Sequence, residues 1–193
     1  MGVSWGAVVR PKHGQTVSGD MYVVEPFTPH GLQLAVIDGL GGGVEAAKAA
    51  QGAVDVIRSS PAQDPAELIR RSHVALHATR GAVLALLTFN LVARSVSFMG
   101  VGNIGIQVYS ALPIKPISKN GIVGHKLPHL LKLAYSYNLG DTFVLYSDGI
   151  SGRFSLDPTF DHSLEPQPLA ETILSRYGKE IDDATVLVLR ITE

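Results

Sequence analysis

The chain has 193 residues, and 46% of them are hydrophobic, which is enough to form a sizeable core. Its sixteen basic and seventeen acidic side chains leave almost no net charge, which argues against a general electrostatic grip on nucleic acid or anionic lipid. The absence of cysteine excludes disulfide scaffolds, thiolate zinc sites and cysteine nucleophiles.

Neither the N-terminal residues nor the most apolar segment of the sequence suggests a membrane protein. The opening residues, MGVSWGAVV, lack the successive basic, apolar and small-residue segments of a secretory signal. The most apolar run, AVLALLTFNLVA, is short and contains Thr88 and Asn90, so it predicts a buried strand instead of a membrane span. We expect a cytoplasmic protein with no membrane and no nucleic-acid partner.

The predicted elements fall into runs of strands separated by clustered helices. Apolar, β-branched or aromatic runs bounded by Gly, Pro, Asp or Asn predict strands at 3–9, 21–25, 32–37, 83–91, 94–99, 104–110, 142–147 and 185–191. Helical periodicity predicts helices at 44–58, 65–80 and 167–177, with Asp64 as the N-cap before Pro65. The segment 112–132, LPIKPISKNGIVGHKLPHLLK, is expected to be an irregular, solvent-exposed loop between strands. This grouping predicts an α+β fold with mainly antiparallel sheet.

Carboxylates stand at matching ends of four predicted strands. Asp38 ends one strand and is followed by Gly39, and Asp148 is followed by Gly149 in the same way. Asp20 lies just before a strand, and the pair at 182–183 lies just before the last one. In an antiparallel sheet the end of one strand lies beside the start of its neighbour, so all four sites can gather on one rim.

Gathered carboxylates repel one another unless protons or cations intervene. Oxygen ligands without cysteine or a histidine triad select hard divalent ions such as Mg²⁺ or Mn²⁺. Each Asp-Gly pair alone is also ordinary turn chemistry, but four acidic sites at matching strand ends favour a metal site. A nucleotide-binding loop is not expected in DGLGGG, because the G-x-G-x-x-G spacing fails and no G-K-[ST] follows.

Six short motifs occur in order over nearly the whole chain: SGD (18–20), DGLGGG (38–43), RGAVLALL (80–87), GVGN (100–103), SDGI (147–150) and DDATVLVL (182–189). Together they resemble the bacterial branch of the PPM-type metal-dependent serine/threonine phosphatases, which contains SpoIIE, RsbU and RsbX, and within it the RsbX type. The resemblance implies a four-layer αββα sandwich, with two mainly antiparallel sheets flanked by helices. It also implies that residues 1–193 form a single phosphatase domain with no separate sensor domain.

The resemblance implies two Mn²⁺ or Mg²⁺ ions that activate a water molecule for in-line attack on phosphorus. Asp38, Asp148 and Asp182 would be catalytic through that water. Asp182 is chosen over Asp183 because it stands three residues before Thr185, which leaves Asp183 to support the site. The complete implied metal set is Asp20, Asp38, Gly39, Asp148, Asp182 and Asp183.

The residues that would protonate the leaving group and bind phosphate differ from those of the eukaryotic relatives. Leu40 stands where many of them carry a histidine, so the leaving-group acid is unassigned. Arg10 and Lys12 are the nearest candidates to bind phosphate. Asn103 is a further candidate to contact the substrate or to support the site by a hydrogen bond, and its alternative is a simple turn. Arg80 is interpreted as structural, near a helix C-terminus where a cation is favoured.

We therefore expect a phosphoserine/phosphothreonine protein phosphatase. The RsbX-type resemblance implies phosphorylated STAS-domain stressosome proteins, of the RsbS and RsbR kinds, as substrates in resetting a bacterial stress signal. One alternative is an RsbU-like or SpoIIE-like phosphatase that acts on an anti-anti-sigma factor. An alternative of a different class is a metal-binding interaction module without catalysis.

Overall fold

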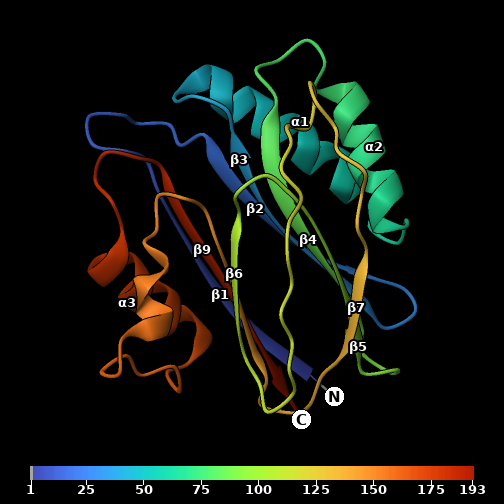
Figure 1. Cartoon of the computed structure of the whole chain (residues 1–193), viewed down its shortest axis with the longest axis vertical. Helices are drawn as coiled ribbons and strands as arrows, with labels where there is room; N and C mark the ends of the chain where they lie inside the picture. Colours follow the sequence, from blue (N-terminus) through green and yellow to red (C-terminus); the bar gives the residue numbers. More distant parts are fainter. Residues whose placement is uncertain (1) are drawn as a thin grey trace.

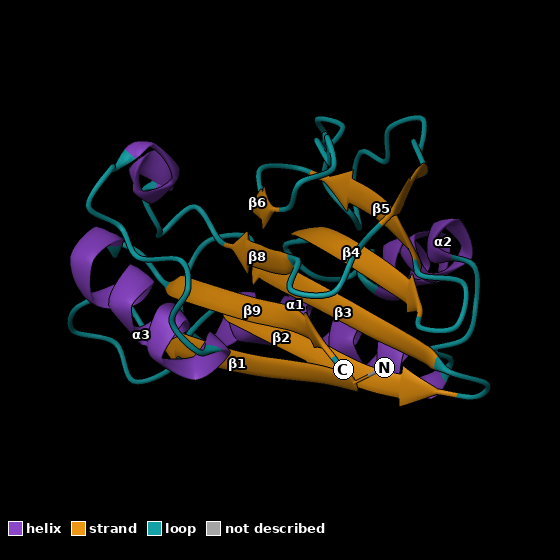
Figure 2. Ribbon diagram, turned by 90° about the horizontal axis from the view of Figure 1, so that it is seen from below, coloured by secondary structure: helices purple, strands orange, loops and turns teal. Residues whose placement is uncertain are grey.

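Two antiparallel sheets stack face to face, with helices on their outer faces, in a computed structural model that describes residues 2–193 (Figures 1 and 2). The order in sheet A is β1 (Gly2–Arg10), β9 (Ala184–Thr192), β8 (Thr142–Tyr146) and β6 (Gly105–Tyr109). The order in sheet B is β2 (Asp20–Phe27), β3 (Gly31–Gly39), β4 (Ala82–Asn90), β5 (Ser95–Val101) and β7 (Leu133–Ser136).

The helices form the two outer layers. Helix α3 (Pro166–Tyr177) packs on β1 and β9 of sheet A, close to the short 3-10 helix η1 (Gly152–Leu156). Helices α1 (Val44–Ser59) and α2 (Pro65–Ala75) lie together on the other side, where α1 packs against β2 and β3 of sheet B (Figure 1). The predicted α+β class and the αββα sandwich are confirmed.

The layering explains why the central strands are apolar on both faces. In β3, Leu34 and Val36 point into the core between the sheets, whereas Ala35 and Ile37 point toward α1 and α2. Successive side chains of a strand alternate between its faces, so a strand enclosed on both sides needs a continuous apolar run. Strand β9 follows the same rule, with its alternate residues facing the intersheet core and α3.

Helix α2 starts as predicted but ends five residues early. The side chain of Asp64 accepts a hydrogen bond from the backbone N–H of Ala66 at 2.9 Å, which confirms the N-cap. The helix ends at Ala75 and not at residue 80. The Thr79 hydroxyl bonds to the Leu76 carbonyl and accepts from the Gly81 N–H, and such local side-chain bonds compete with helical ones.

The segment 112–132 is largely irregular, as expected, but it leads into a strand that the sequence did not predict. Strand β7 pairs with β5 at the edge of sheet B, from Leu133 opposite Phe98 to Ser136 opposite Ser95. With only four residues, it is too short to give a clear alternation signal. No helix within residues 2–193 combines the length and hydropathy of a membrane span.

Candidate metal centre

Asp20 and Asp38 face each other across the β2–β3 ladder of sheet B. Asp20 is the first residue of β2, and its register partner is Asp38, next to the last residue of β3. Asp20 is only 3% exposed, whereas Asp38 is half-buried. The antiparallel pairing therefore brings two carboxylates together at one end of sheet B.

Sheet A supplies three more carboxylates from the end of β8 and the start of β9. These two strands pair antiparallel, which brings the residues just after Tyr146 beside those just before Ala184. Asp148 and Asp182 are half-buried there, and Asp183 is buried. Gly149 allows a close approach, since a Cβ on it would lie 1.8 Å from the Asp183 carbonyl oxygen.

The carboxylates of the two sheets act on one another electrostatically. Burial raises the pKa of Asp38 to about 8, and the charges of Asp20, Asp148, Asp182 and Asp183 add to the increase. The five carboxylates are therefore close enough to interact, at one rim of the sandwich. We call this set, Asp20, Asp38, Asp148, Asp182 and Asp183, the carboxylate rim.

Asp20 has the least favourable surroundings for a charge. Burial raises its pKa to about 7, and the charges of Asp183 and Asp148 contribute, although the hydroxyls of Ser147 and Thr185 oppose the shift. Its Oδ2 is buried and has no hydrogen-bond partner within residues 2–193. A buried carboxylate oxygen without a partner is stabilised by a proton or a cation.

These residues fit a hard divalent ion. They offer oxygen donors, one of them unsatisfied, and the carbonyl of Gly39 lies at the start of β2, 3.3 Å from where a Cβ on Gly19 would be. Within the described residues, no group of three or more acidic or histidine side chains is arranged so that it could hold a metal ion as the side chains stand. Mg²⁺ keeps several waters and commonly takes only one or two carboxylates, so a sparse ligand set is compatible with it.

Asp183 is committed to hydrogen bonds inside the protein. One of its oxygens accepts from the backbone N–H of Lys12, and the other accepts from that of Gly19, both at 2.8 Å. It therefore ties the segment after β1 and the approach to β2 to the start of β9. Asp183 thus holds the loops around the rim, and the choice of Asp182 as the metal ligand stays a prediction.

Asn103 lies at the rim and bonds to a carboxylate there. Its Nδ2 donates to Oδ2 of Asp148 at 2.9 Å. The backbone carbonyl of Asp148 accepts from Lys179 Nζ at 2.6 Å, so both parts of this aspartate are held. Of the roles considered for Asn103, the geometry favours orientation of Asp148 over direct contact with a substrate.

The predicted phosphate-binding residues separate in the structure. Arg10 donates from Nη2 to the carbonyl of Lys179 at 2.5 Å, so its guanidinium holds the loop before β9. Lys12 instead extends its side chain to Gly42, where a Cβ would lie 2.8 Å from Nζ. Arg80, interpreted as structural from sequence, lies in the same way against Gly41. Gly39 of β3 pairs with Ala82 of β4, so the residues just before Ala82 lie beside those just after Gly39. A prediction of this pairing from sequence could have placed Arg80 at Gly41.

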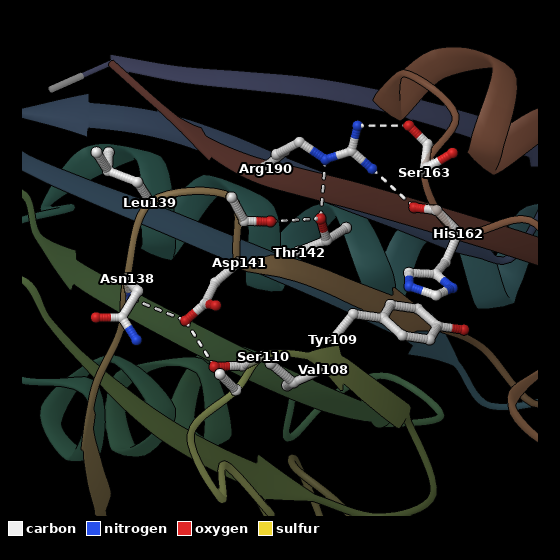
Figure 3. A pocket seen from close by; sticks show the side chains of 12 residues that line it. Val108, Tyr109, Ser110, Asn138, Leu139, Asp141, Thr142, His162, Ser163 and Arg190 are labelled. Carbon is white, nitrogen blue, oxygen red and sulfur yellow. Dashed lines mark hydrogen bonds between the residues drawn. The ribbon is translucent and has the colours of Figure 1, made fainter.

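A pocket of about 700 Å³ lies at the opposite end of sheet A, where β8 begins and β9 ends (Figure 3). Arg190 in this pocket donates to the Thr142 hydroxyl and to the carbonyls of His162 and Ser163. Asp141 accepts from the hydroxyl of Ser110 and the backbone N–H of Asn138. Its two charged groups are thus occupied within the protein, and the carboxylate rim remains the candidate centre.

Comparisons with known proteins agree with this arrangement. A family model described as stage II sporulation protein E (SpoIIE) matches residues 28–192. One solved chain is 33% identical in sequence to this one. It comes from work on the bacterial stressosome, described as a modular system that has been adapted to control secondary messenger signalling. That alignment covers 98% of this chain and 100% of the other, with a TM-score of 0.91.

Two further structures are similar in fold. RsbX in complex with magnesium has a TM-score of 0.85 at 22% identity, over 98% of this chain and 96% of that one. The PP2C phosphatase domain of SpoIIE from Bacillus subtilis, with a fragment of its regulatory domain, has a TM-score of 0.76 at 24% identity. This last alignment covers 99% of this chain and 64% of the other. No curated protein sequence matches the chain.

Proposed function

Since the chain belongs to the SpoIIE family of PPM-type phosphatases, we propose that it is a metal-dependent phosphoserine/phosphothreonine protein phosphatase. The observation that carries the proposal is the carboxylate rim, in which burial and the charges of four other aspartates raise the pKa of Asp38. Such a set is unfavourable by itself and becomes favourable around divalent cations. We take residues 1–193 as one catalytic domain.

The ligands of two Mg²⁺ or Mn²⁺ ions would come from both sheets: Asp20, Asp38, Gly39, Asp148 and Asp182. Such ions lower the pKa of a coordinated water and neutralise charge on phosphoryl oxygens. Asp38 and Asp20 contribute as neighbours in one ladder, so their spacing is fixed by the β2–β3 register. Asp148 is held by Asn103, and Asp183 fixes the loops around the rim.

We further propose phosphorylated STAS-domain proteins of a stressosome, of the RsbS and RsbR kinds, as the substrates. The support is the chain from stressosome work, which is 33% identical over almost the full length of both chains. The similarity in fold to RsbX is consistent with the same system. An anti-anti-sigma factor is the competing substrate, and both kinds of protein belong in the assay.

The deciding experiment is phosphate release from a phosphoserine-bearing STAS protein, with Mn²⁺ or Mg²⁺ and with chelator. Wild type is compared with Asp38→Asn and with Asp55→Asn, a control that removes an exposed carboxylate from α1. Metal-dependent turnover that is lost only in Asp38→Asn supports the proposal. A folded, metal-loaded wild type that releases no phosphate from STAS substrates, anti-anti-sigma factors or a phosphopeptide panel would favour the interaction module instead.

A further inference from the structure

The glycine loop, residues 40–43 between β3 and α1, has a positively charged side chain on each side. A Cβ on Gly41 would lie 2.5 Å from Arg80 Nη1, and a Cβ on Gly42 would lie 2.8 Å from Lys12 Nζ. The loop follows directly after Asp38 and Gly39, so both cations lie next to the carboxylate rim. They reach it from segments far apart in sequence, one after β1 and one before β4.

Arg80 is brought there by backbone contacts on both of its sides. The N–H of Leu40 bonds to the carbonyl of Gly81 at 3.0 Å, and Gly81 also donates to the Thr79 hydroxyl. The early end of α2 therefore directs the chain to the glycine loop. Lys12 is fixed at its backbone, which donates to Asp183. Backbone hydrogen bonds thus fix the main chain at or next to Arg80 and Lys12, whereas their charged groups lie at the glycine loop.

Within the part of the chain that the structure describes, the charged ends of these two residues have no ionic partner. The ion pairs found within residues 2–193 involve Arg58, Arg70, Lys132 and Arg176, and neither Arg80 nor Lys12 takes part. Two further cations near the rim, Arg10 and Lys179, each donate to a backbone carbonyl. Arg80 is exposed and Lys12 partly so, which leaves both accessible to a ligand.

We propose that Arg80 and Lys12 bind the phosphate group of the phosphorylated substrate from the side of the glycine loop. The proposal rests on the phosphatase function proposed above and assigns the residues that hold the phosphoryl oxygens not bound by metal. Arginine offers planar paired donors that match a phosphate, and lysine adds a compact positive charge. Both would also offset the repulsion between a phosphate dianion and the carboxylate rim.

This role gives a reason for the bare glycines of the loop. Gly41 has a φ of +99°, which side-chain-bearing residues rarely adopt, and any side chain there would displace Arg80. Gly42 has no such backbone constraint, yet a side chain on it would meet Lys12. The absence of side chains therefore lets both cations lie close against the loop.

The test uses the full chain loaded with Mn²⁺ and the variants Arg80→Ala, Arg80→Lys, Lys12→Ala and the Arg80→Ala/Lys12→Ala pair. Arg71→Ala is the matched control, because Arg71 is an exposed arginine that bonds to Ser60, at the far end of α1 from the loop. Three quantities are measured: kinetics on a phosphoserine peptide, binding of inorganic phosphate by calorimetry, and affinity for Mn²⁺.

We expect each alanine variant to raise KM and the dissociation constant of inorganic phosphate about tenfold, as loss of a charge-assisted hydrogen bond would. Arg80→Lys should recover part of the loss, and Mn²⁺ affinity and the Arg71→Ala control should stay within about twofold of wild type. A purely structural role would weaken Mn²⁺ binding together with phosphate binding, and that result would overturn the proposal.

The outcomes separate this proposal from the proposed function. Turnover by wild type with unchanged KM and phosphate affinity in the paired variant would remove the role of Arg80 and Lys12 and leave the phosphatase intact. Phosphate binding that depends on both residues, without turnover of any substrate, would keep the binding site and remove the phosphatase. A wild type that neither binds nor releases phosphate would refute both.

Discussion

Asp20 and Asp38 are direct partners in the β2–β3 ladder, and burial raises the pKa of both, to about 7 and about 8. The backbone register thus holds two carboxylates at a spacing that is unfavourable when both are ionised. A divalent cation between the sheets would remove this penalty. The folded protein would consequently gain stability from the metal that the proposed function requires.

The Asp38→Asn variant should separate stability from function. The amide keeps the shape of the side chain but removes the charge, so we expect the melting temperature of the metal-free protein to rise by about 3 °C or more. Metal affinity should fall at least tenfold, and phosphate release should be lost. Thermal unfolding with chelator and calorimetric metal titration measure the two effects. A lower melting temperature without metal would contradict the electrostatic explanation.

The metal-free protein should lose stability as the pH rises. The folded state binds protons at Asp20 and Asp38 more tightly than the unfolded chain, where their pKa is 3.8. Stability from these groups is fully present below about pH 4 and is lost as the pH rises through about 7 to 8, by up to about 1.4 kcal/mol per pH unit for each group. Denaturant unfolding with chelator between about pH 5.5 and 8.5 tests this.

Asp157 and Asp161 do not interfere in that range. Hydrogen bonds to Asp157 and Asp161 lower their pKa values, so their stabilising effect is lost only in more acidic solution. With saturating Mg²⁺ the trend should reverse, because deprotonated carboxylates bind the ion better. A flat profile in the metal-free protein would show that the two aspartates do not titrate as a buried pair.

Much of the arrangement at the rim could be predicted from sequence because it depends on strand ends. Asp38 and Asp148 each follow an apolar run and precede a glycine, and antiparallel pairing then brings strand ends and starts together. The assignment of strands to sheets was beyond this reasoning, as was β7, whose four residues give no usable period. The expected position of Arg80 near a helix C-terminus was wrong, because helix α2 already ends at Ala75. Local side-chain hydrogen bonds compete with the helical ones there, and periodicity does not detect them.

Replacement of Asp183 and Asp182 should give opposite patterns. Asp183→Ala removes the acceptors of one buried and one partly buried backbone N–H group, so it should cost about 2–4 kcal/mol of unfolding free energy. Asp182→Ala should cost less than about 1 kcal/mol and should mainly weaken metal binding and turnover. Chemical denaturation and metal titration of both variants check this. If the metal-free stability fell equally in both, the division of roles would be wrong.

Asn103 should matter through the orientation of Asp148. Asn103→Ala removes the donor to Asp148 Oδ2, and loss of such a supporting contact typically lowers metal affinity or activity about 10- to 100-fold. Asn103→Gln, which keeps the amide on a longer side chain, is the comparison, and KM should change less than kcat in both. An Asn103→Ala variant in which only KM rises would indicate that Asn103 contacts the substrate.

Gly149→Ala should disturb the rim by collision. The added Cβ would lie 1.8 Å from the Asp183 carbonyl oxygen and 2.7 Å from its carbonyl carbon, so backbone has to move. We expect a loss of about 1–3 kcal/mol in unfolding free energy, with weaker metal binding because Asp148 and Asp182 move with their loops. Gly52→Ala in α1 is the matched control, since its Cβ would meet only Leu76 Cδ1 at 3.3 Å and alanine favours a helix. Unfolding and metal titration of the two variants therefore distinguish a local collision at the rim from a general effect of replacing glycine, and equal losses in both would refute the steric role of Gly149.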